Sequence, residues 1–130
     1  MSRGNVDIVR HAFDALNRGA IDEMFEAAAD DLVMDWSNSI SPLKGVYRGR
    51  ESGRRFVASF VDAFESVSWD PLEFIEIDDA TLVVVNHVRM RGRASGVEVE
   101  VTGAHLWTFR DGQATSIKLF QTKHDALDAA

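Results

Sequence analysis

Two runs of alternating apolar and polar residues, at positions 81–93 and 96–109, constrain the fold more than any other part of the sequence. Alternation with a period of two is typical of strands that bury one face. The short Ala94-Ser95 segment between the runs predicts an antiparallel hairpin closed by a two-residue loop.

The charged residues of these runs indicate how the two strands pair. With a two-residue loop, Arg91 lies opposite Glu98. The same register places Arg89 opposite Glu100, so that opposite charges face each other twice. A slip of one residue removes both pairs, and the charges therefore favour this register.

The opposite face of the predicted hairpin is apolar except for Asn86 and His105, which lie close together on it. Buried polar groups need hydrogen-bond partners, so these two are either a structural hydrogen-bonded site or the polar end of a ligand cavity. We expect helices to cover this face, because a sheet buries one face against another layer. The apolar residues on it are Leu82, Val84, Val88, Met90, Val97, Val99, Val101, Gly103 and Trp107.

Helical spacing of apolar residues predicts three helices before these strands. The first covers residues 6–17, with Asn5 as its N-cap and Gly19 just past its end. The third runs from about residue 50 to residue 66. Between them, a short second helix buries Ile21, Met24, Phe25 and Ala28.

Further strands are predicted at residues 32–36, 72–77 and 114–121, and residues 37–45 read as a loop that contains Pro42 and could form a pocket rim. The Asp111-Gly112 turn fits either a two-residue loop or a three-residue loop with a bulge. Of these two, only the second turns the apolar side chains of the last strand toward the apolar face, together with Gln121. Helices followed by an antiparallel meander predict a single α+β domain over residues 1–130.

Composition narrows the classes of function. A formal net charge of −7 disfavours a nucleic-acid-binding protein, which would need a basic face. No apolar run approaches the roughly 20 residues of a membrane span, and the first five residues lack the apolar core of a signal peptide. With no cysteine there is neither a disulfide framework nor thiolate chemistry, and we expect a cytoplasmic location.

Three strings, VRHAFDALNRG at 9–19, GVYRGRE at 45–51 and HLWTFRDG at 105–112, resemble the NTF2-like superfamily and in particular its SnoaL-like branch. The resemblance spans nearly the whole chain. It implies a cystatin-like cone, with three N-terminal helices on a strongly curved, mostly antiparallel sheet around a deep pocket. It also implies a homodimer through the outer face of the sheet, where His87 would lie.

The same resemblance argues against the best-known reactions of this superfamily. The general-base aspartate of the ketosteroid isomerases falls at Trp36, their oxyanion-hole tyrosine at Ala12 and their protonated aspartic acid at His105. The acid/base aspartate of polyketide cyclases falls near Thr122. The Arg-x-Asp string of an epoxide hydrolase is replaced by Arg89-Met90-Arg91.

His105 is the best candidate for a chemical role, since an imidazole in an apolar cavity could act as general acid or base or hydrogen-bond a carbonyl group. The alternative is a core histidine bonded to Asn86 or to a backbone carbonyl. The other expected pocket residues are Trp36, Tyr47, Met90 and Trp107, each of which could equally be plain core or rim.

Other polar groups carry weaker signals. The four histidines lack metal-ligand spacing, so no metal and no other cofactor is predicted. Asp35 is expected to be solvated rather than catalytic. The arginines at 48, 50, 54 and 55 could contact an anion at the start of the third helix, although such a run is more often a solvated face.

The sequence thus leaves two functions open. In the first, the protein binds a small, largely apolar molecule, with or without cofactor-free acid–base chemistry at His105 such as isomerisation, cyclisation or hydration. In the second, it is a non-catalytic dimeric module that binds a ligand or a protein.

Overall fold

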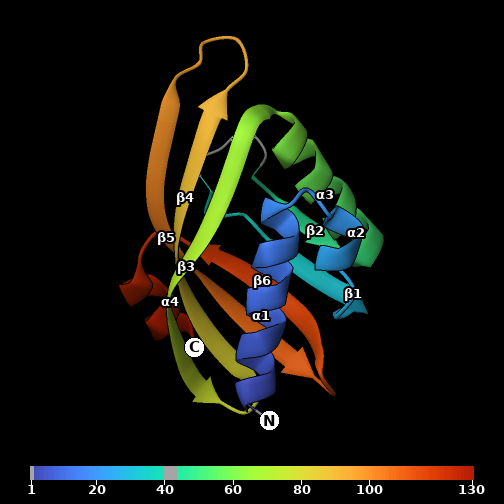
Figure 1. Cartoon of the computed structure of the whole chain (residues 1–130). Helices are drawn as coiled ribbons and strands as arrows, with labels where there is room; N and C mark the ends of the chain where they lie inside the picture. Colours follow the sequence, from blue (N-terminus) through green and yellow to red (C-terminus); the bar gives the residue numbers. More distant parts are fainter. Residues whose placement is uncertain (1, 40–43) are drawn as a thin grey trace.

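The computed structural model describes residues 2–39 and 44–130. These residues fold into one curved sheet with helices on both sides (Figure 1). Four residues of the predicted 37–45 loop, including Pro42, lie outside the described residues. The elements, in chain order, are α1 (Ser2–Asn17), α2 (Ile21–Met24), β1 (Ala28–Asp35), β2 (Val46–Arg48), α3 (Arg50–Asp62), β3 (Phe64–Asp78), β4 (Thr81–Gly92), β5 (Glu98–Arg110), β6 (Gln113–Phe120) and α4 (Lys123–Ala129).

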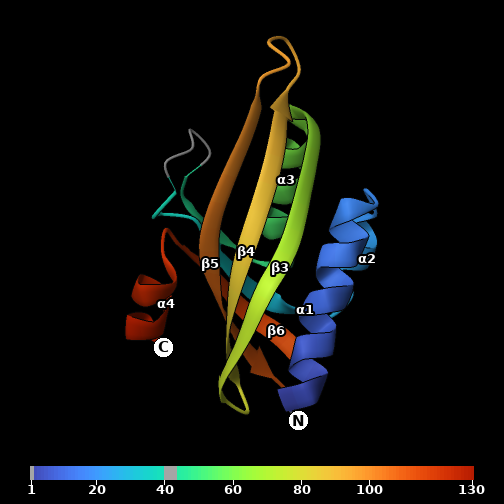
Figure 2. The ribbon, with the colours of Figure 1, turned by 60° about the vertical axis from the view of Figure 1, so that its left-hand side comes forward.

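The sheet has six strands in the order β2-β1-β6-β5-β4-β3. All neighbours are antiparallel except β1 and β6, which are parallel, so the sheet is mostly antiparallel as expected. Helices α1, α2 and α3 lie on its concave side and α4 lies on the other side (Figure 2). The α+β fold is confirmed, and the described residues form four helices rather than the three expected.

The β4–β5 register is the predicted one. Arg91 lies opposite Glu98 and Arg89 lies opposite Glu100, with closest N···O distances of 3.6 and 3.2 Å. The loop is longer than predicted, because β4 ends at Gly92 and β5 begins only at Glu98. Gly96 has a φ of +67° and its N–H donates to the carbonyl of residue 92, so a four-residue turn closes the same register.

The β5–β6 turn matches neither of the predicted alternatives completely. Asp111 and Gly112 have φ of +53° and +77° and form a two-residue loop between the paired residues on either side. A bulge then follows inside β6, where the pairing shifts by one residue at Thr115. Ile117 therefore faces Trp107, and the last strand turns its apolar side inward although the loop is short.

The predicted helix boundaries need three corrections. Helix α1 begins at Ser2, so Asn5 lies inside it and is not its N-cap; its Nδ2 instead donates to the Asp79 carbonyl at 2.7 Å. Helix α2 has only four residues, and Ala28 belongs to β1. Helix α3 ends at Asp62, four residues earlier than expected, because the chain turns directly into β3.

Strand β3 is much longer than the predicted 72–77 segment and contains Pro71. It lies at the edge of the sheet, where a residue without an N–H is tolerated, and the pairing with β4 shifts between Pro71 and Glu73. Its first half is tied to α1: Asn17 donates to the Trp69 carbonyl at 2.7 Å and accepts from the Trp69 N–H at 2.8 Å.

Strand β2 and helix α4 were not predicted. Thr122 caps α4 by accepting a hydrogen bond from the Asp125 N–H at 3.1 Å. The helix buries Ala126 completely against Val83 and Ala104 on the convex face of the sheet. Part of the outer face is therefore covered by the chain itself.

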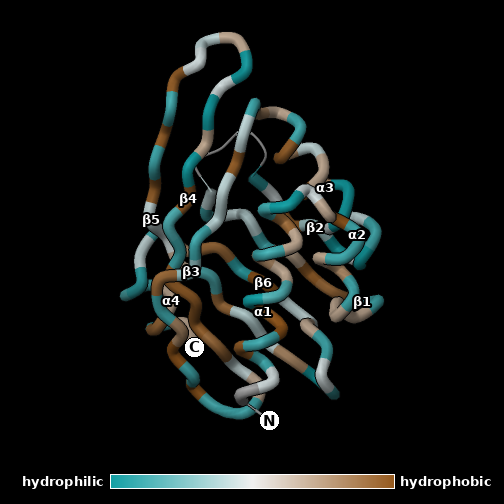
Figure 3. Tube along the Cα trace, viewed as in Figure 1, coloured by the Kyte–Doolittle hydropathy of each residue, from teal (hydrophilic) through white to brown (hydrophobic). Residues whose placement is uncertain are grey.

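The helices cover the apolar face of the β4–β5 hairpin only in part. Val97, Val99 and Val101 are 59, 45 and 41% exposed, although they share a face with the buried Trp107. The hairpin extends beyond the helices (Figure 1), and apolar and polar residues alternate along β5 (Figure 3). The prediction of a fully covered face is therefore wrong at this end of the hairpin.

Candidate functional site

An open cavity of about 340 Å³, here called the outer cavity, lies on the concave side of β3, β4, β5 and β6 beside the end of α3. Its aromatic rings come from Trp36, Phe60, Phe64 and Trp69, whereas Phe120 borders the cavity but packs its ring with Val83 and Ala104 on the convex face. The polar residues that line it are Ser39, Asn86, Thr102, His105 and Gln121, although the Thr102 hydroxyl lies 3.4 Å from His87 Nδ1 on the other face of the sheet. None of the described residues around it carries a charged side chain, so it suits a neutral molecule.

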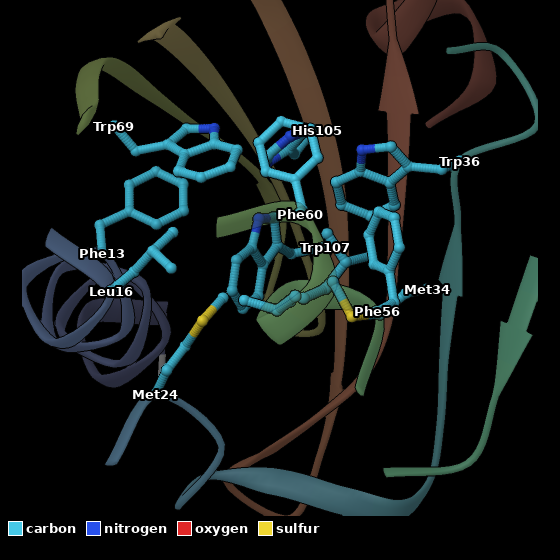
Figure 4. Close-up of a pocket in the computed structure, with 12 residues that line it drawn as sticks. Phe13, Leu16, Met24, Met34, Trp36, Phe56, Phe60, Trp69, His105 and Trp107 are labelled. Carbon is cyan, nitrogen blue, oxygen red and sulfur yellow. The ribbon is translucent and has the colours of Figure 1, made fainter. Parts of the chain in front are cut away.

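A second, deeper cavity of about 30 Å³, here called the inner cavity, is lined by residues of α1, α2, α3 and the sheet (Figure 4). Trp36, Phe60, Trp69 and His105 line both cavities. These four side chains therefore separate the outer cavity from the core. The inner cavity has room for water but not for an organic ligand.

His105 is positioned by the central strand β5, opposite Val84 on β4 and Leu119 on β6. Its side chain is buried, with the ring centroid 5.2 Å from that of Trp36 and 6.1 Å from that of Phe13. Desolvation lowers the pKa of His105 to about 4, so the imidazole is neutral at pH 7. Its Nδ1 is buried and has no hydrogen-bond partner within residues 2–39 and 44–130.

Asn86 lies on β4 opposite Gly103, diagonally across from His105, and is 1% exposed. Neither its Oδ1 nor its Nδ2 has a hydrogen-bond partner among the described residues. An unpaired buried amide costs free energy, on the order of 1–3 kcal/mol for each group. The alternative of a core bond between Asn86 and His105 is not realised, because both amide atoms of Asn86 are unpaired among the described residues.

The structure brings four of the expected pocket residues together, because Trp36, Asn86, Met90 and His105 all line the outer cavity. Trp107 lies deeper and lines the inner cavity. Tyr47 lies outside the linings of both cavities. Its ring stacks on Phe56 with centroids 4.2 Å apart, on the helix side of the inner cavity.

Sequence reasoning did not place Phe60, Phe64 and Trp69 at the site. The first two fall within the predicted third helix, and Trp69 lies between that helix and the predicted strand at 72–77. The early end of α3 moves Phe64 into β3 and brings all three side chains to the same cavity. The signal that could have found this strand is the side chain of Asn17, which can pair with a strand backbone.

Other candidate groups have structural partners. Arg50 donates to the Phe25 carbonyl at 3.0 Å and Arg54 donates to Asp22 at 2.5 Å, so these two arginines tie α3 to the α2 region. Burial raises the pKa of Asp35, but hydrogen bonds from Ser37 and the nearby lysine outweigh burial and hold it below its ordinary value. Asp35 is therefore ionised at neutral pH, and it is not part of the cavity lining.

Within the described part of the chain, no three His, Asp or Glu residues are grouped so that they could hold a metal ion. Nor does any described helix have the length and apolar character needed to cross a bilayer.

The comparison with protein families is decisive for the class of this fold. The model of the SnoaL-like domain matches residues 9–117. The chain belongs to the SnoaL-like domain family. The matched region includes the strands that carry Asn86 and His105 and ends inside β6. Among curated protein sequences, none matches the chain.

Solved structures share the fold of this SnoaL-like protein. An NTF2-like protein of unknown function from Burkholderia pseudomallei is 22% identical, with a TM-score of 0.81 over 96% of this chain and 95% of that one. A Mycobacterium tuberculosis protein in complex with estradiol-17β-hemisuccinate is 13% identical, with a TM-score of 0.78 over 93% and 95%. The epoxide hydrolase/cyclase-like enzyme SalBIII, which acts in pyran ring formation in the polyether salinomycin, is 21% identical, with a TM-score of 0.75 over 92% and 91%. At these identities the likeness establishes the fold alone.

Proposed function

We propose that the protein binds a small, neutral, largely apolar molecule in the outer cavity, with Asn86 and His105 as its polar contacts. The observation that carries the proposal is the Asn86 side chain, whose amide oxygen and nitrogen are both buried without a partner among the described residues, beside a cavity lined mostly by apolar residues. Such groups are rare unless a partner arrives from outside the chain. The volume of about 340 Å³ lies within the usual range for small-molecule sites.

The chemistry of such a site would be free of cofactors. A histidine with a pKa near 4 is a poor general base at neutral pH, but its neutral ring can donate a hydrogen bond to a carbonyl oxygen. We therefore propose that any reaction here polarises a carbonyl group, as in an isomerisation, a cyclisation or a hydration. The solved relatives supply precedents for ligand binding and for ring formation on this fold.

Isothermal titration calorimetry with estradiol, a naphthol and a medium-chain 2-alkanone tests the binding proposal. We expect saturable binding of at least one of these neutral probes to the wild type. Asn86→Leu keeps the branching at Cγ and the number of side-chain heavy atoms and removes the hydrogen bonds, so affinity should fall about fivefold, since one hydrogen bond contributes about 1 kcal/mol.

Gln113→Leu is the matched control, because it removes an exposed amide that lies outside both cavities. It should bind like the wild type. Equal affinities of the Asn86→Leu variant and the wild type, or no binding of any probe, would contradict the proposal.

The second candidate is a non-catalytic dimeric module that binds a ligand or a protein through the same fold. It is favoured by Trp36 and Ala12, which stand where isomerases of this superfamily would carry catalytic side chains. The proposed dimer would use the part of the outer face not covered by α4, where His87 contacts Glu100 at 3.1 Å. Light scattering that gives the mass of one chain at micromolar concentration would exclude this dimer.

A further inference from the structure

Two residues that line the same small cavity each carry a buried ring nitrogen. Trp107 Nε1 and His105 Nδ1 are both buried and have no hydrogen-bond partner within residues 2–39 and 44–130. Both residues line the inner cavity of about 30 Å³. Figure 4 shows the Trp107 ring with its nitrogen on the edge nearer to His105.

The chemistry of the lining leaves these two nitrogens with few choices. An indole Nε1–H can only donate a hydrogen bond, and Trp36 and Trp69 add only further donors of the same kind. The imidazole of His105 is the one side chain among the described lining residues that can accept a hydrogen bond through nitrogen. A space of this size holds about one or two water molecules, and water can both accept and donate.

We infer that the inner cavity binds a water molecule that accepts a hydrogen bond from Trp107 Nε1–H and donates one to His105 Nδ1. This arrangement makes Trp107 a positioning residue for His105. In the opposite arrangement, with hydrogen on Nδ1, the water accepts twice and neither of its hydrogens has a partner from these two rings. The first arrangement satisfies one more polar group and is therefore preferred.

The water fixes which nitrogen of His105 carries hydrogen. Desolvation keeps the ring neutral at pH 7, so an accepting Nδ1 requires the hydrogen to be on Nε2. The ring then offers an N–H, rather than a lone pair, to a carbonyl group in the outer cavity. This last step rests on the proposed ligand site, whereas the water and the tautomer belong to the protein without ligand.

The experiment is a long-range ¹H–¹⁵N correlation spectrum of the uniformly labelled, ligand-free protein at pH 7. We expect the Nε2–H tautomer of His105 to exceed the Nδ1–H tautomer about fivefold, the effect of one net hydrogen bond of about 1 kcal/mol. A nuclear Overhauser effect between water and the Trp107 Nε1 proton should accompany it. Trp107→Phe removes the donor and should bring the two tautomers toward equal populations.

Trp69→Phe is the matched control, because it removes another indole N–H from the same cavity, one that is not buried without a partner. It should leave the tautomer ratio unchanged. Hydrogen on Nδ1 in the wild type, or no contact of the Trp107 proton with water, would overturn the inference even if Trp107→Phe does not fold. If the tautomer is as expected but no neutral probe binds, only the proposed function fails.

Discussion

At the scale of single residues, the site is a histidine held neutral by its surroundings. The lowered pKa of His105 has burial as its cause. Its position on the apolar face followed from the strand register alone. Its protonation could not be predicted, because the rings that desolvate it, Trp36 and Phe13, come from segments far away in sequence.

The same burial makes the stability of the fold depend on pH. In the unfolded chain His105 titrates near 6.5, and in the folded chain its pKa is lowered to about 4. Below pH 6.5 the unfolded state binds a proton that the folded state does not, so stability is lost as the pH falls from 6.5 to 4 and is retained above 6.5. The loss attributable to this group approaches about 3 kcal/mol.

Urea unfolding at pH 7 and pH 4.5 measures this effect, with His105→Phe as the comparison. Phenylalanine fits an apolar ring site and does not titrate, so the variant should lose less stability than the wild type between the two pH values. Equal losses in the two proteins would mean that His105 is protonated in the folded state.

At the scale of elements, the sequence predicted the pairing of strands that carry opposite charges and alternate between apolar and polar residues. The β4–β5 register followed from two ion pairs, and it placed Asn86 and His105 on one face. The first half of β3 was missed because its pairing shifts between Phe64 and Ser66, so that Phe64 breaks the alternation of residues 66–71 and instead continues the helical spacing from Phe60. That half carries Trp69, so the site predicted from the sequence lacked one of the aromatic residues that line the outer cavity.

The hydrogen bonds between α1 and β3 therefore allow a test of what positions Trp69 at the outer cavity. Asn17→Ala removes two hydrogen bonds to the backbone of Trp69 and should lower the free energy of unfolding by about 1–2 kcal/mol. Arg18→Ala, which removes only exposed ion pairs next to it, should have little effect. Equal stability of the Asn17→Ala variant and the wild type in urea unfolding would show that α1 does not position this strand.

At the scale of the whole molecule, the curved sheet and its helices form an outer cavity with an apolar wall and a polar end. The sequence indicated this class of fold through the order of its elements and three short strings. It could not indicate that one end of the β4–β5 hairpin is left uncovered, because the exposure of Val97, Val99 and Val101 depends on where the helices end. Nor could it indicate α4, which covers part of the convex face.

The most direct test of the account is a chemical-shift map of the wild type titrated with the neutral probe that binds best. We expect the largest changes at the Asn86 side-chain amide, the His105 ring and the indole protons of Trp36 and Trp69, since all four side chains line the outer cavity. His87 on the convex face should not shift. Changes confined to the convex face, or saturation without any change at Asn86 and His105, would contradict a ligand site in this cavity.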